Sequence, residues 1–261
     1  MYWWWPRHRC CRRSALSYNS MNQRQDGEPL KQKLSILYTH QDFVVVDKPA
    51  GILVHSNPRF PNEYPLVQRL RNQLGQHVYP VHRLDRQTSG CLLFALRSEP
   101  VSSLAQSLKE GKKSYWAFVR GAFPHDEDVI VETPIKTKRG NYLPAKSTVR
   151  CIAKCTEPRS SMLCVEPSTG RRHQVRRHVR DLHHPILHDG DHGDSRVNRM
   201  WKKQFGLSRL ALHCYSITLC YQEEVLSFFS PLHGDLADVF RKIPWWEEAV
   251  LREPRLEIKS L

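Results

Sequence analysis

The stretch that most constrains this chain is VHRLDRQTSG at residues 81–90, which the apolar run CLLFAL at residues 91–96 follows directly. An apolar run bounded by turn residues is typical of a strand buried in the core. The Thr-Ser-Gly sequence before it is typical of a turn. Asp85 is therefore expected on a loop that a buried strand of a central sheet holds in place.

Asp85 lies between Arg83 and Arg86 in this loop. Positive charges nearby favour the ionised form of a carboxylate. A fixed, ionised Asp can act as a nucleophile or as an electrostatic stabiliser, although it is a poor general acid. The alternative is an ordinary surface ion pair, which contributes little to stability. The residues alone leave both interpretations open.

The motif around Asp85 is one of several that occur in a fixed order along the chain. They are VVVDKPAGILVH at residues 44–55, HRLD at 82–85 with TSG at 88–90, KSYWA at 113–117, GRRHQVR at 170–176 and HPILHD at 184–189. Together they resemble the signature of the RluA-type pseudouridine synthases over roughly residues 34–240. His188 stands where that family has glycine.

The resemblance implies an α+β protein with the pseudouridine-synthase fold. In that fold a central, mostly antiparallel and bent sheet is flanked by helices and carries a central catalytic cleft. The pseudouridine synthase catalytic domain is expected at residues 34–245, between a basic N-terminal extension at 1–33 and a C-terminal tail at 246–261.

The activity that the resemblance implies is the isomerisation of uridine to pseudouridine in structured RNA, tRNA before other RNAs. Uracil is detached from C1′, turned and rejoined through C5, a change that needs neither a redox partner nor a cofactor. Asp85 would attack or stabilise the sugar at C1′, or assist its deprotonation. Tyr115 would contact the uracil and help to remove the C5 proton, and Arg176 would orient Asp85 and keep it charged.

Tyr115 and Arg176 also have ordinary interpretations when the sequence is taken alone. Tyr115 begins the strand pattern at residues 115–119, where a tyrosine is most often a core aromatic. Arg176 belongs to a predicted helix at residues 171–182 in which arginines recur every four residues, and such a face is usually solvated or in contact with RNA. Because Arg176 adjoins the apolar stripe of this helix, it could instead point inward at an acid.

Chemistry on a base in a structured RNA requires that the base first leave its stack, which costs roughly a few kcal/mol. Arg83 is the candidate to occupy the vacated space. Contacts between arginine and the RNA backbone position the RNA without reading its sequence. The other candidate substrate-binding residues are His82, Arg86, Thr88, Arg171, Arg172, His173 and Gln174.

The charge balance supports a polyanionic partner. Lys and Arg total 40 and Asp and Glu total 26, which gives a formal net charge of +14. Such a chain favours nucleic acid first and anionic membranes second. No apolar run is long enough to span a bilayer. We therefore expect RNA as the partner, no membrane association and a monomer, although many basic proteins bind no nucleic acid.

Seven His and Asp side chains between residues 183 and 194 suggest a metal site, which would make the protein a metal-dependent hydrolase. Pro185 breaks the spacing that a metal-binding helix needs, so we expect no metal. The segment HGDSRVNR at 192–199 resembles the TruC-like branch of the family, whose members act on uridine 65 of tRNA. Action on rRNA, or an RNA-binding protein that keeps the fold without catalysis, are the alternatives.

The N-terminal segment differs in composition from the rest. Residues 1–33 begin with a run of aromatic residues and carry five arginines before the first acid, Asp26. This composition is typical of an organelle transit peptide or of a disordered basic tail. The protein is thus expected in the cytoplasm, or in mitochondria or plastids. The eight cysteines contain no Cys-x-x-Cys pair, which fits free thiols in a reducing compartment.

Local patterns predict three further helices. One spans residues 65–74 and ends at Gly75, with its leucines on one face. Ser98 is expected to cap a second helix that ends at Gly111. A third is expected at residues 234–242.

Overall fold

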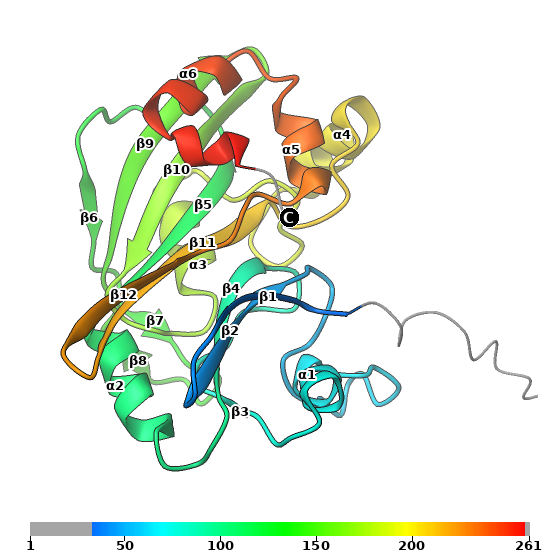
Figure 1. Ribbon diagram of the computed structural model, residues 1–261. Coiled ribbons are helices and arrows are strands. Elements are labelled where there is room, and N and C mark those ends of the chain that lie inside the picture. Colours follow the sequence, from blue (N-terminus) through cyan, green and yellow to red (C-terminus); the bar gives the residue numbers. More distant parts are fainter. Residues whose placement is uncertain (1–32, 259–261) are drawn as a thin grey trace, which may run out of the picture. The chain divides into compact units, whose positions relative to one another are not determined.

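Two β-sheets and six α-helices make up residues 33–258, which are the residues that the computed structural model describes (Figure 1). The larger sheet has ten strands in the order β1-β2-β4-β11-β5-β10-β9-β6, with β12 paired to β11 and β3 paired to β4. β7 and β8 form a separate hairpin. The predicted N-terminal extension at residues 1–33 lies outside the described residues, apart from Lys33.

The elements have the following bounds. The strands are β1 (Ser35–Thr39), β2 (Phe43–Lys48), β3 (Tyr79–Pro80), β4 (Ser89–Ala95), β5 (Lys112–Arg120), β6 (Val129–Val131), β7 (Ile135–Lys136), β8 (Tyr142–Leu143), β9 (Ser147–Thr156), β10 (Arg159–Pro167), β11 (Leu212–Tyr221) and β12 (Glu224–Phe229). The helices are α1 (Leu66–Leu74), α2 (Val101–Glu110), α3 (Gln174–Asp181), α4 (Ser195–Phe205), α5 (Gly234–Phe240), α6 (Trp246–Arg252) and the 3-10 helix η1 (Pro254–Glu257).

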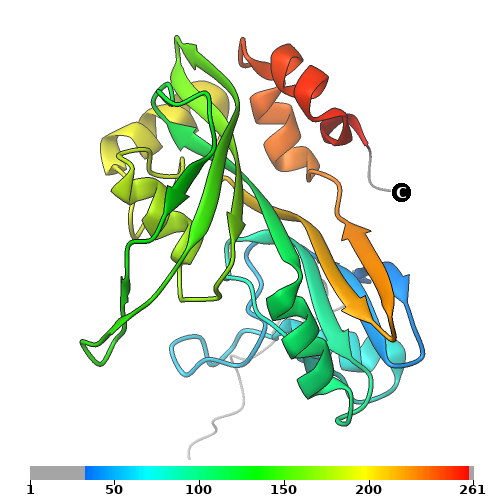
Figure 2. The same cartoon turned by 90° about the vertical axis from the view of Figure 1, so that its left-hand side faces the viewer.

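Strand direction in the large sheet agrees with the expectation. Its described strand pairs are antiparallel except β4 with β11, which are parallel. Figure 2 shows α3, α4 and the β7–β8 hairpin on one side of the sheet and α5 and α6 on the other. The predicted α+β fold, with a mostly antiparallel central sheet flanked by helices, is therefore confirmed.

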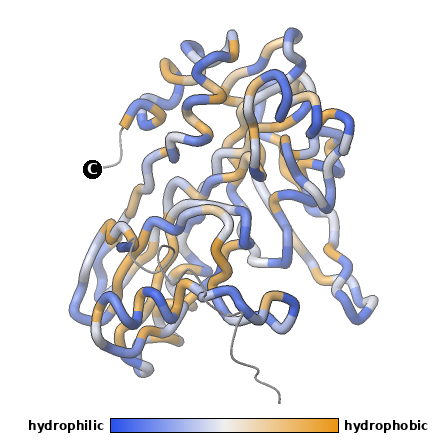
Figure 3. Tube along the Cα trace, turned by 90° about the vertical axis from the view of Figure 1, so that its right-hand side faces the viewer, coloured by the Kyte–Doolittle hydropathy of each residue, from blue (hydrophilic) through white to orange (hydrophobic). Residues whose placement is uncertain are grey.

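The core is continuous across the sheet because helices cover both of its faces. Every residue of β2 and β4 is buried. Trp116 on β5 stacks on Tyr215 with ring centroids 4.3 Å apart, and Phe118 stacks on Phe240 of α5 at 3.9 Å. Along the helices the tube in Figure 3 alternates between hydrophilic and hydrophobic residues, the pattern of helices with one buried face.

Gly90 lets the loop that carries Asp85 enter the sheet beside β11. Its φ is +113°, and it pairs with Cys214 in the one parallel contact of the described sheet. A Cβ atom at this position would lie 2.1 Å from the carbonyl oxygen of Cys214. Only glycine has both the positive φ and the absence of a side chain that this approach requires.

The helix predictions are right in location and differ at the ends. The predicted helix at residues 65–74 is α1, which ends at Gly75 with a φ of +68°. The predicted cap at Ser98 is wrong, because α2 begins at Val101 after Pro100, and a residue before proline is disfavoured in a helix. The helix expected at 234–242 is α5, which ends two residues earlier, at Phe240.

The predicted helix at residues 171–182 begins three residues late in the structure. His173 has a φ of +54°, a left-handed conformation that a helix cannot include. The first helical residue of α3 is therefore Gln174. The deviation matters for the site, because the left-handed backbone at His173 sets the direction of its side chain just before α3.

The segment after residue 245 contributes to the same core as residues 34–245. α6 and η1 follow one another and pack near β9. Trp246, Ala249 and Leu256 are buried there. In the described part of the chain no helix has the length and apolar character needed to cross a membrane.

Replacing Gly90 by alanine should destabilise the fold strongly. The added Cβ meets the backbone of β11, which cannot move without breaking the sheet, so we expect the free energy of unfolding to fall by at least about 2 kcal/mol. Gly140→Ala is the control, because Gly140 also has a positive φ, +93°, but has no atom within 4 Å of the added Cβ. Equal losses in urea unfolding for the two variants would contradict the steric explanation.

Candidate active site

Lys48 holds the backbone of the loop that carries Asp85. This lysine ends β2 and is fully buried. Its ammonium donates hydrogen bonds to the carbonyl oxygens of Pro49 at 2.9 Å, Arg86 at 3.1 Å and Thr88 at 2.7 Å. Two of these acceptors, Arg86 and Thr88, follow Asp85 in the loop. The lysine at the end of β2 therefore fixes the backbone on the C-terminal side of Asp85.

Burial of Lys48 changes its protonation. Desolvation, and after it the positive charge of Arg209, lower the pKa of this ammonium to about 7, while Asp85 acts in the opposite direction. The protonated form has three N–H groups, which match its three carbonyl acceptors. The lysine is therefore a structural cation whose charge depends on pH near neutrality.

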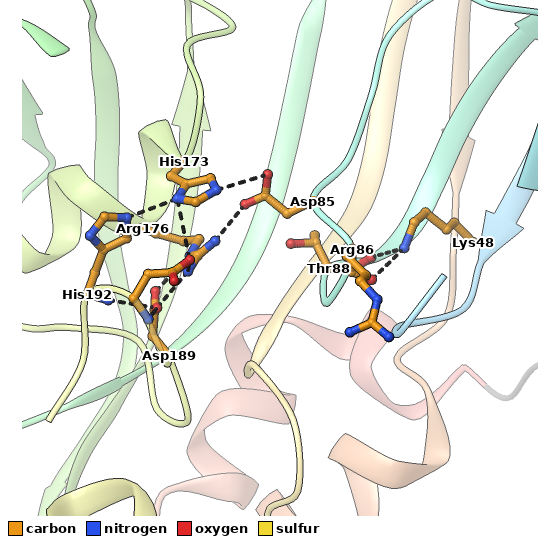
Figure 4. Close-up of polar contacts among 9 residues, drawn as sticks. Lys48, Asp85, Arg86, Thr88, His173, Arg176, Asp189 and His192 are labelled. Carbon is orange, nitrogen blue, oxygen red and sulfur yellow. Dashed lines mark hydrogen bonds and ion pairs between the residues drawn. The ribbon is translucent and has the colours of Figure 1, made fainter. Parts of the chain in front are cut away.

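Arg176 holds Asp85 from the other side, and Figure 4 shows the arrangement. Its Nη1 donates to Oδ2 of Asp85 at 3.0 Å. Its Nε and Nη2 each donate to the carboxylate of Asp189 at 2.7 Å, and Nη2 also donates to Asp191 at 2.8 Å. One guanidinium thus joins α3, the Asp85 loop and the loop after residue 188.

The charges in this cluster are mutually stabilised. Burial acts to lower the pKa of Arg176, but the hydrogen bonds and charge of Asp189, together with the charge of Asp85, outweigh it and raise this pKa. Burial acts to raise the pKa of Asp189, and Arg176 reverses this, so the pKa of Asp189 falls. The side chain of Arg176 is 8% exposed and that of Asp85 is 25% exposed. Asp85 is therefore the member of the pair that solvent reaches more easily.

His173 lies against the same carboxylate. Its Nε2 is 3.9 Å from Oδ1 of Asp85, and its Nδ1 shares a hydrogen bond of 3.0 Å with Nε2 of His192. Burial lowers the pKa of His173 to about 4; Asp85 opposes this shift and Arg176 reinforces it. The imidazole is therefore neutral at neutral pH, and its contact with Asp85 is a polar contact rather than an ion pair.

Tyr115 lies on β5, where it pairs with Val165 on one side and Cys214 on the other. Its side chain is buried, and Cys214 is its neighbour on β11. Burial, followed by Cys214 and then Asp85, raises the pKa of Tyr115 well above that of a free phenol. The hydroxyl group is therefore fully protonated at neutral pH.

One group of residues in the described part of the chain could hold a metal ion. His173, Asp191 and His192 place ligand atoms within 4.8 Å of one another. In this structure Asp191 accepts a hydrogen bond from Arg176, and the two histidines bond to each other. A cation here would have to displace the guanidinium, so the arrangement favours ion pairing over metal binding.

Comparison with known proteins gives the family. The family model described as RNA pseudouridylate synthase matches residues 42–181. The tRNA pseudouridine synthase C of Vibrio parahaemolyticus is 35% identical over 243 residues, which cover 84% of this chain and 98% of that protein. The tRNA pseudouridine synthase C of Yersinia pestis is 39% identical over 208 residues, which cover 71% of this chain and 80% of that protein.

The chain belongs to the RNA pseudouridylate synthase family. Two solved human structures have the same fold. RNA Pseudouridylate Synthase Domain Containing 1 superposes with a TM-score of 0.63 at 24% identity, covering 79% of this chain and 86% of that one. RNA Pseudouridylate Synthase Domain Containing 4 has a TM-score of 0.62 at 21% identity, covering 87% and 94%. This protein is accordingly an isomerase of the pseudouridine synthase class.

Three of the sequence-predicted substrate-binding residues of this synthase are engaged within the fold. Nε2 of His82 accepts the backbone N–H of Leu93 at 3.0 Å, and burial lowers the pKa of His82 to about 3. Thr88 is buried, and its hydroxyl group has no hydrogen-bond partner among the described residues. The amide of Gln174 bonds to Thr169 at 2.7 Å and to the Lys146 carbonyl at 2.9 Å. The hydrogen bonds of His82 and Gln174 therefore support the structure of the site.

The predicted arginines divide into two groups. Arg86 donates to Glu63 at 2.6 Å, and Arg171 donates to the Pro144 carbonyl at 3.0 Å. Arg83 and Arg172 are exposed, and within residues 33–258 their side chains make no hydrogen bond or ion pair. The second group keeps its donors available to RNA.

Sequence reasoning missed two supporting residues, Lys48 and Asp189. In the sequence Lys48 is only a member of the motif at residues 44–55, and Asp189 is one of the His and Asp residues considered as metal ligands. The only local signal is the glycine that the family has in place of His188, because His188 has a φ of +60°, the conformation that presents Asp189 to Arg176. A buried lysine and a buried aspartate look like surface residues in a sequence.

Replacing Lys48 by methionine should produce a pH-dependent loss of stability. Above pH 7 the folded protein releases the Lys48 proton, whereas the unfolded chain keeps it up to about pH 10.4. The unfolded state then binds more protons, so the contribution of Lys48 to the free energy of unfolding rises with pH in this window. The difference in free energy of unfolding between wild type and Lys48→Met should therefore increase by up to about 1.4 kcal/mol per pH unit.

Urea unfolding between pH 6 and 9 measures this difference. Lys109→Met is the matched control, because Lys109 is an exposed lysine on α2. A difference for Lys48→Met that is as flat with pH as that of the control would contradict the lowered pKa.

Proposed function

We propose that this protein converts a uridine of tRNA to pseudouridine, with Asp85 as the residue that acts on the sugar. The observation that carries the proposal is the Asp85 carboxylate itself, one quarter exposed and held at 3.0 Å by a buried guanidinium. A carboxylate oriented in this way can be held at a fixed position relative to C1′ of a bound nucleotide.

The proposed reaction breaks the bond between C1′ and N1 of the uracil and forms a bond between C1′ and C5. The C5 proton is lost and N1 gains a proton, so atoms and electrons balance without an oxidant or a reductant. Asp85 either attacks C1′, stabilises positive charge that develops there, or assists deprotonation of the sugar. All three routes need an ionised carboxylate directed at the ribose.

Arg176 is a positioning residue in this proposal. Its planar guanidinium makes fork-like bonds to Asp189 and a single bond to Asp85, so it directs the reactive carboxylate from a fixed point. Arg83 is exposed next to the loop and is free to take the space of an everted base. His173 borders Asp85 as a neutral imidazole.

Tyr115 is assigned to contact with the uracil. Its raised pKa opposes a free phenolate at neutral pH, so removal of the C5 proton through Tyr115 requires that the hydroxyl group pass its own proton onward during the step. Its cross-strand neighbour Cys214 is a thiol whose pKa burial raises to about 12, so both groups stay neutral in the resting enzyme.

Two observations support tRNA as the substrate. The relatives from Vibrio parahaemolyticus and Yersinia pestis are named tRNA pseudouridine synthases, and the first is matched over 98% of its length. The net charge of +14 suits a polyanionic substrate. The free cysteines of the described chain suit a reducing compartment such as the cytoplasm or an organelle matrix.

Asp85→Asn should abolish pseudouridine formation and leave tRNA binding in place. The amide keeps the shape of the side chain but removes the charge and the nucleophile, so we expect the rate to fall by about 10²–10⁴-fold or more. The measurement is pseudouridine in unmodified tRNA transcripts, by mass spectrometry and carbodiimide mapping. Asp128→Asn is the control, because Asp128 pairs with Arg150 outside the site. Pseudouridine formation by Asp85→Asn at the wild-type rate would contradict the proposal.

Arg176→Lys should lower kcat with a smaller effect on KM. An ammonium is a point charge that cannot hold Asp189 through two parallel bonds and Asp85 through a third. Displacement of the carboxylate by about 1 Å is expected to lower kcat by about 10²-fold. Steady-state kinetics on tRNA, with circular dichroism to verify folding, tests this expectation. An unchanged kcat in a folded variant would remove Arg176 from its positioning role.

A further inference from the structure

Helix α4 carries a cluster of positive charge that the proposed chemistry does not use. Its sequence is SRVNRMWKKQF, without an acidic residue. The basic face of α4 is defined here as Arg196, Arg199, Lys202 and Lys203. All four are exposed, and within residues 33–258 none forms an ion pair or a side-chain hydrogen bond. The cluster therefore has no anionic partner inside the described protein.

The opposite face of α4 fixes the helix to the core. Trp201 is buried, and its ring packs at a tilt against those of Phe205 and Phe240, with centroids 4.6 Å and 6.0 Å apart. Val197, Trp201 and Phe205 recur every four residues, so they form one apolar stripe. Arg196, Arg199 and Lys203 follow the other helical spacing and share the outward face.

The ends of α4 are also fixed. The side chain of Asp194 accepts the backbone N–H of Arg196 at 2.8 Å and binds Arg120 at 3.1 Å. Gly206 ends the helix with a φ of +79°. A helix held at both ends and along one face presents its basic side chains from a rigid support.

This support is connected to the catalytic pair. The amide of Asn198 donates to the carbonyl of Asp189 at 2.9 Å and accepts the N–H of His188 at 2.9 Å. The carboxylate of Asp189 in turn holds Arg176, which holds Asp85. Three consecutive contacts thus set the distance between α4 and the proposed reacting carboxylate. Figure 2 shows α4 on the same side of the sheet as α3, which supplies Arg176.

The basic face is unfavourable for the isolated protein. Positive residues three or four positions apart on a helix repel one another. Arg196 also lies at the positive end of the helix dipole. A polyanion would offset both effects, and a row of phosphates matches a helix of roughly 16 Å.

We propose that the basic face of α4 binds the phosphodiester backbone of the substrate RNA, at a site other than the reacting uridine. The inference rests on the proposed function and adds to it a second contact that fixes the register of the RNA relative to Asp85. Charge complementarity and the chain of contacts from Asn198 to Asp85 select RNA over an acidic protein or an anionic membrane.

The test is the double variant Arg199→Gln/Lys203→Gln in the full chain. Binding of an unmodified tRNA transcript is measured by fluorescence anisotropy at several salt concentrations. Loss of two phosphate contacts should weaken binding and reduce the slope of log affinity against log salt by about 2. In steady-state kinetics KM should rise while kcat stays unchanged, because the contact is the same in the ground state and the transition state.

The matched control is Lys109→Gln/Lys242→Gln, which removes the same charge from exposed residues on α2 and after α5. An affinity and salt slope for the α4 variant equal to those of the control would overturn the proposal. The proposal would also be overturned if the α4 variant lost binding to phosphatidylserine vesicles but kept wild-type affinity for tRNA. Arg199→Lys retains the charge and should keep the wild-type salt slope, because that slope depends on the number of phosphates neutralised.

The two proposals fail separately. If wild-type protein makes no pseudouridine in tRNA, the proposed function fails, and the anisotropy measurement still reports on α4. If wild-type protein modifies tRNA and the α4 variant shows wild-type KM and salt slope, only the α4 contact fails.

Discussion

The rest of the site depends on the guanidinium of Arg176, which three carboxylates share. The side chain of Asp189 is fully buried, so its charge is tolerable only next to a cation. Asp85 and Asp191 complete the ring of acceptors. Because a guanidinium presents its donors in one plane at fixed angles, the three carboxylates cannot move independently.

This shared cation has a structural consequence beyond Asp85. The loop after residue 188 folds over Arg176, and its backbone N–H groups at Asp191 and His192 donate to Asp189 at 2.9 Å. The same loop leads directly into α4. The position of the Asp85 carboxylate and the position of a basic surface helix are therefore determined by one set of hydrogen bonds, even though they are far apart in the sequence.

A second cation, Lys48, acts on the backbone rather than on the carboxylate. It fixes the loop carbonyls on the C-terminal side of Asp85, and Gly90 then lets the chain enter the sheet against β11. Asp85 thus projects from a segment tied to β2 and β4, while its side chain is tied to α3. The carboxylate is held at both ends, and only the part that faces away from Arg176 remains accessible.

Much of the fold follows from local patterns, because short-range physics decides it. The buried strand after the Thr-Ser-Gly turn, the helix that ends at Gly75 and the strand through Tyr115 have clear periodicity and turn residues. α4 was not predicted, although Val197, Trp201 and Phe205 have helical spacing. The neighbouring His and Asp residues were considered as metal ligands, which we did not expect, and no helix was assigned to that segment. Their true partner, Arg176, precedes the cluster on another element.

The sequence by itself determined the order of the motifs, the loop that carries Asp85 and the family, because these depend on residues close together in the chain. The tertiary structure alone decided which acids share Arg176, that Lys48 is buried, and that the side chains of His82 and Gln174 form hydrogen bonds within the fold. The physical reason is that burial and long-range ion pairing are properties of the surroundings that a side chain meets after folding. No local pattern distinguishes a buried Asp189 from an exposed one.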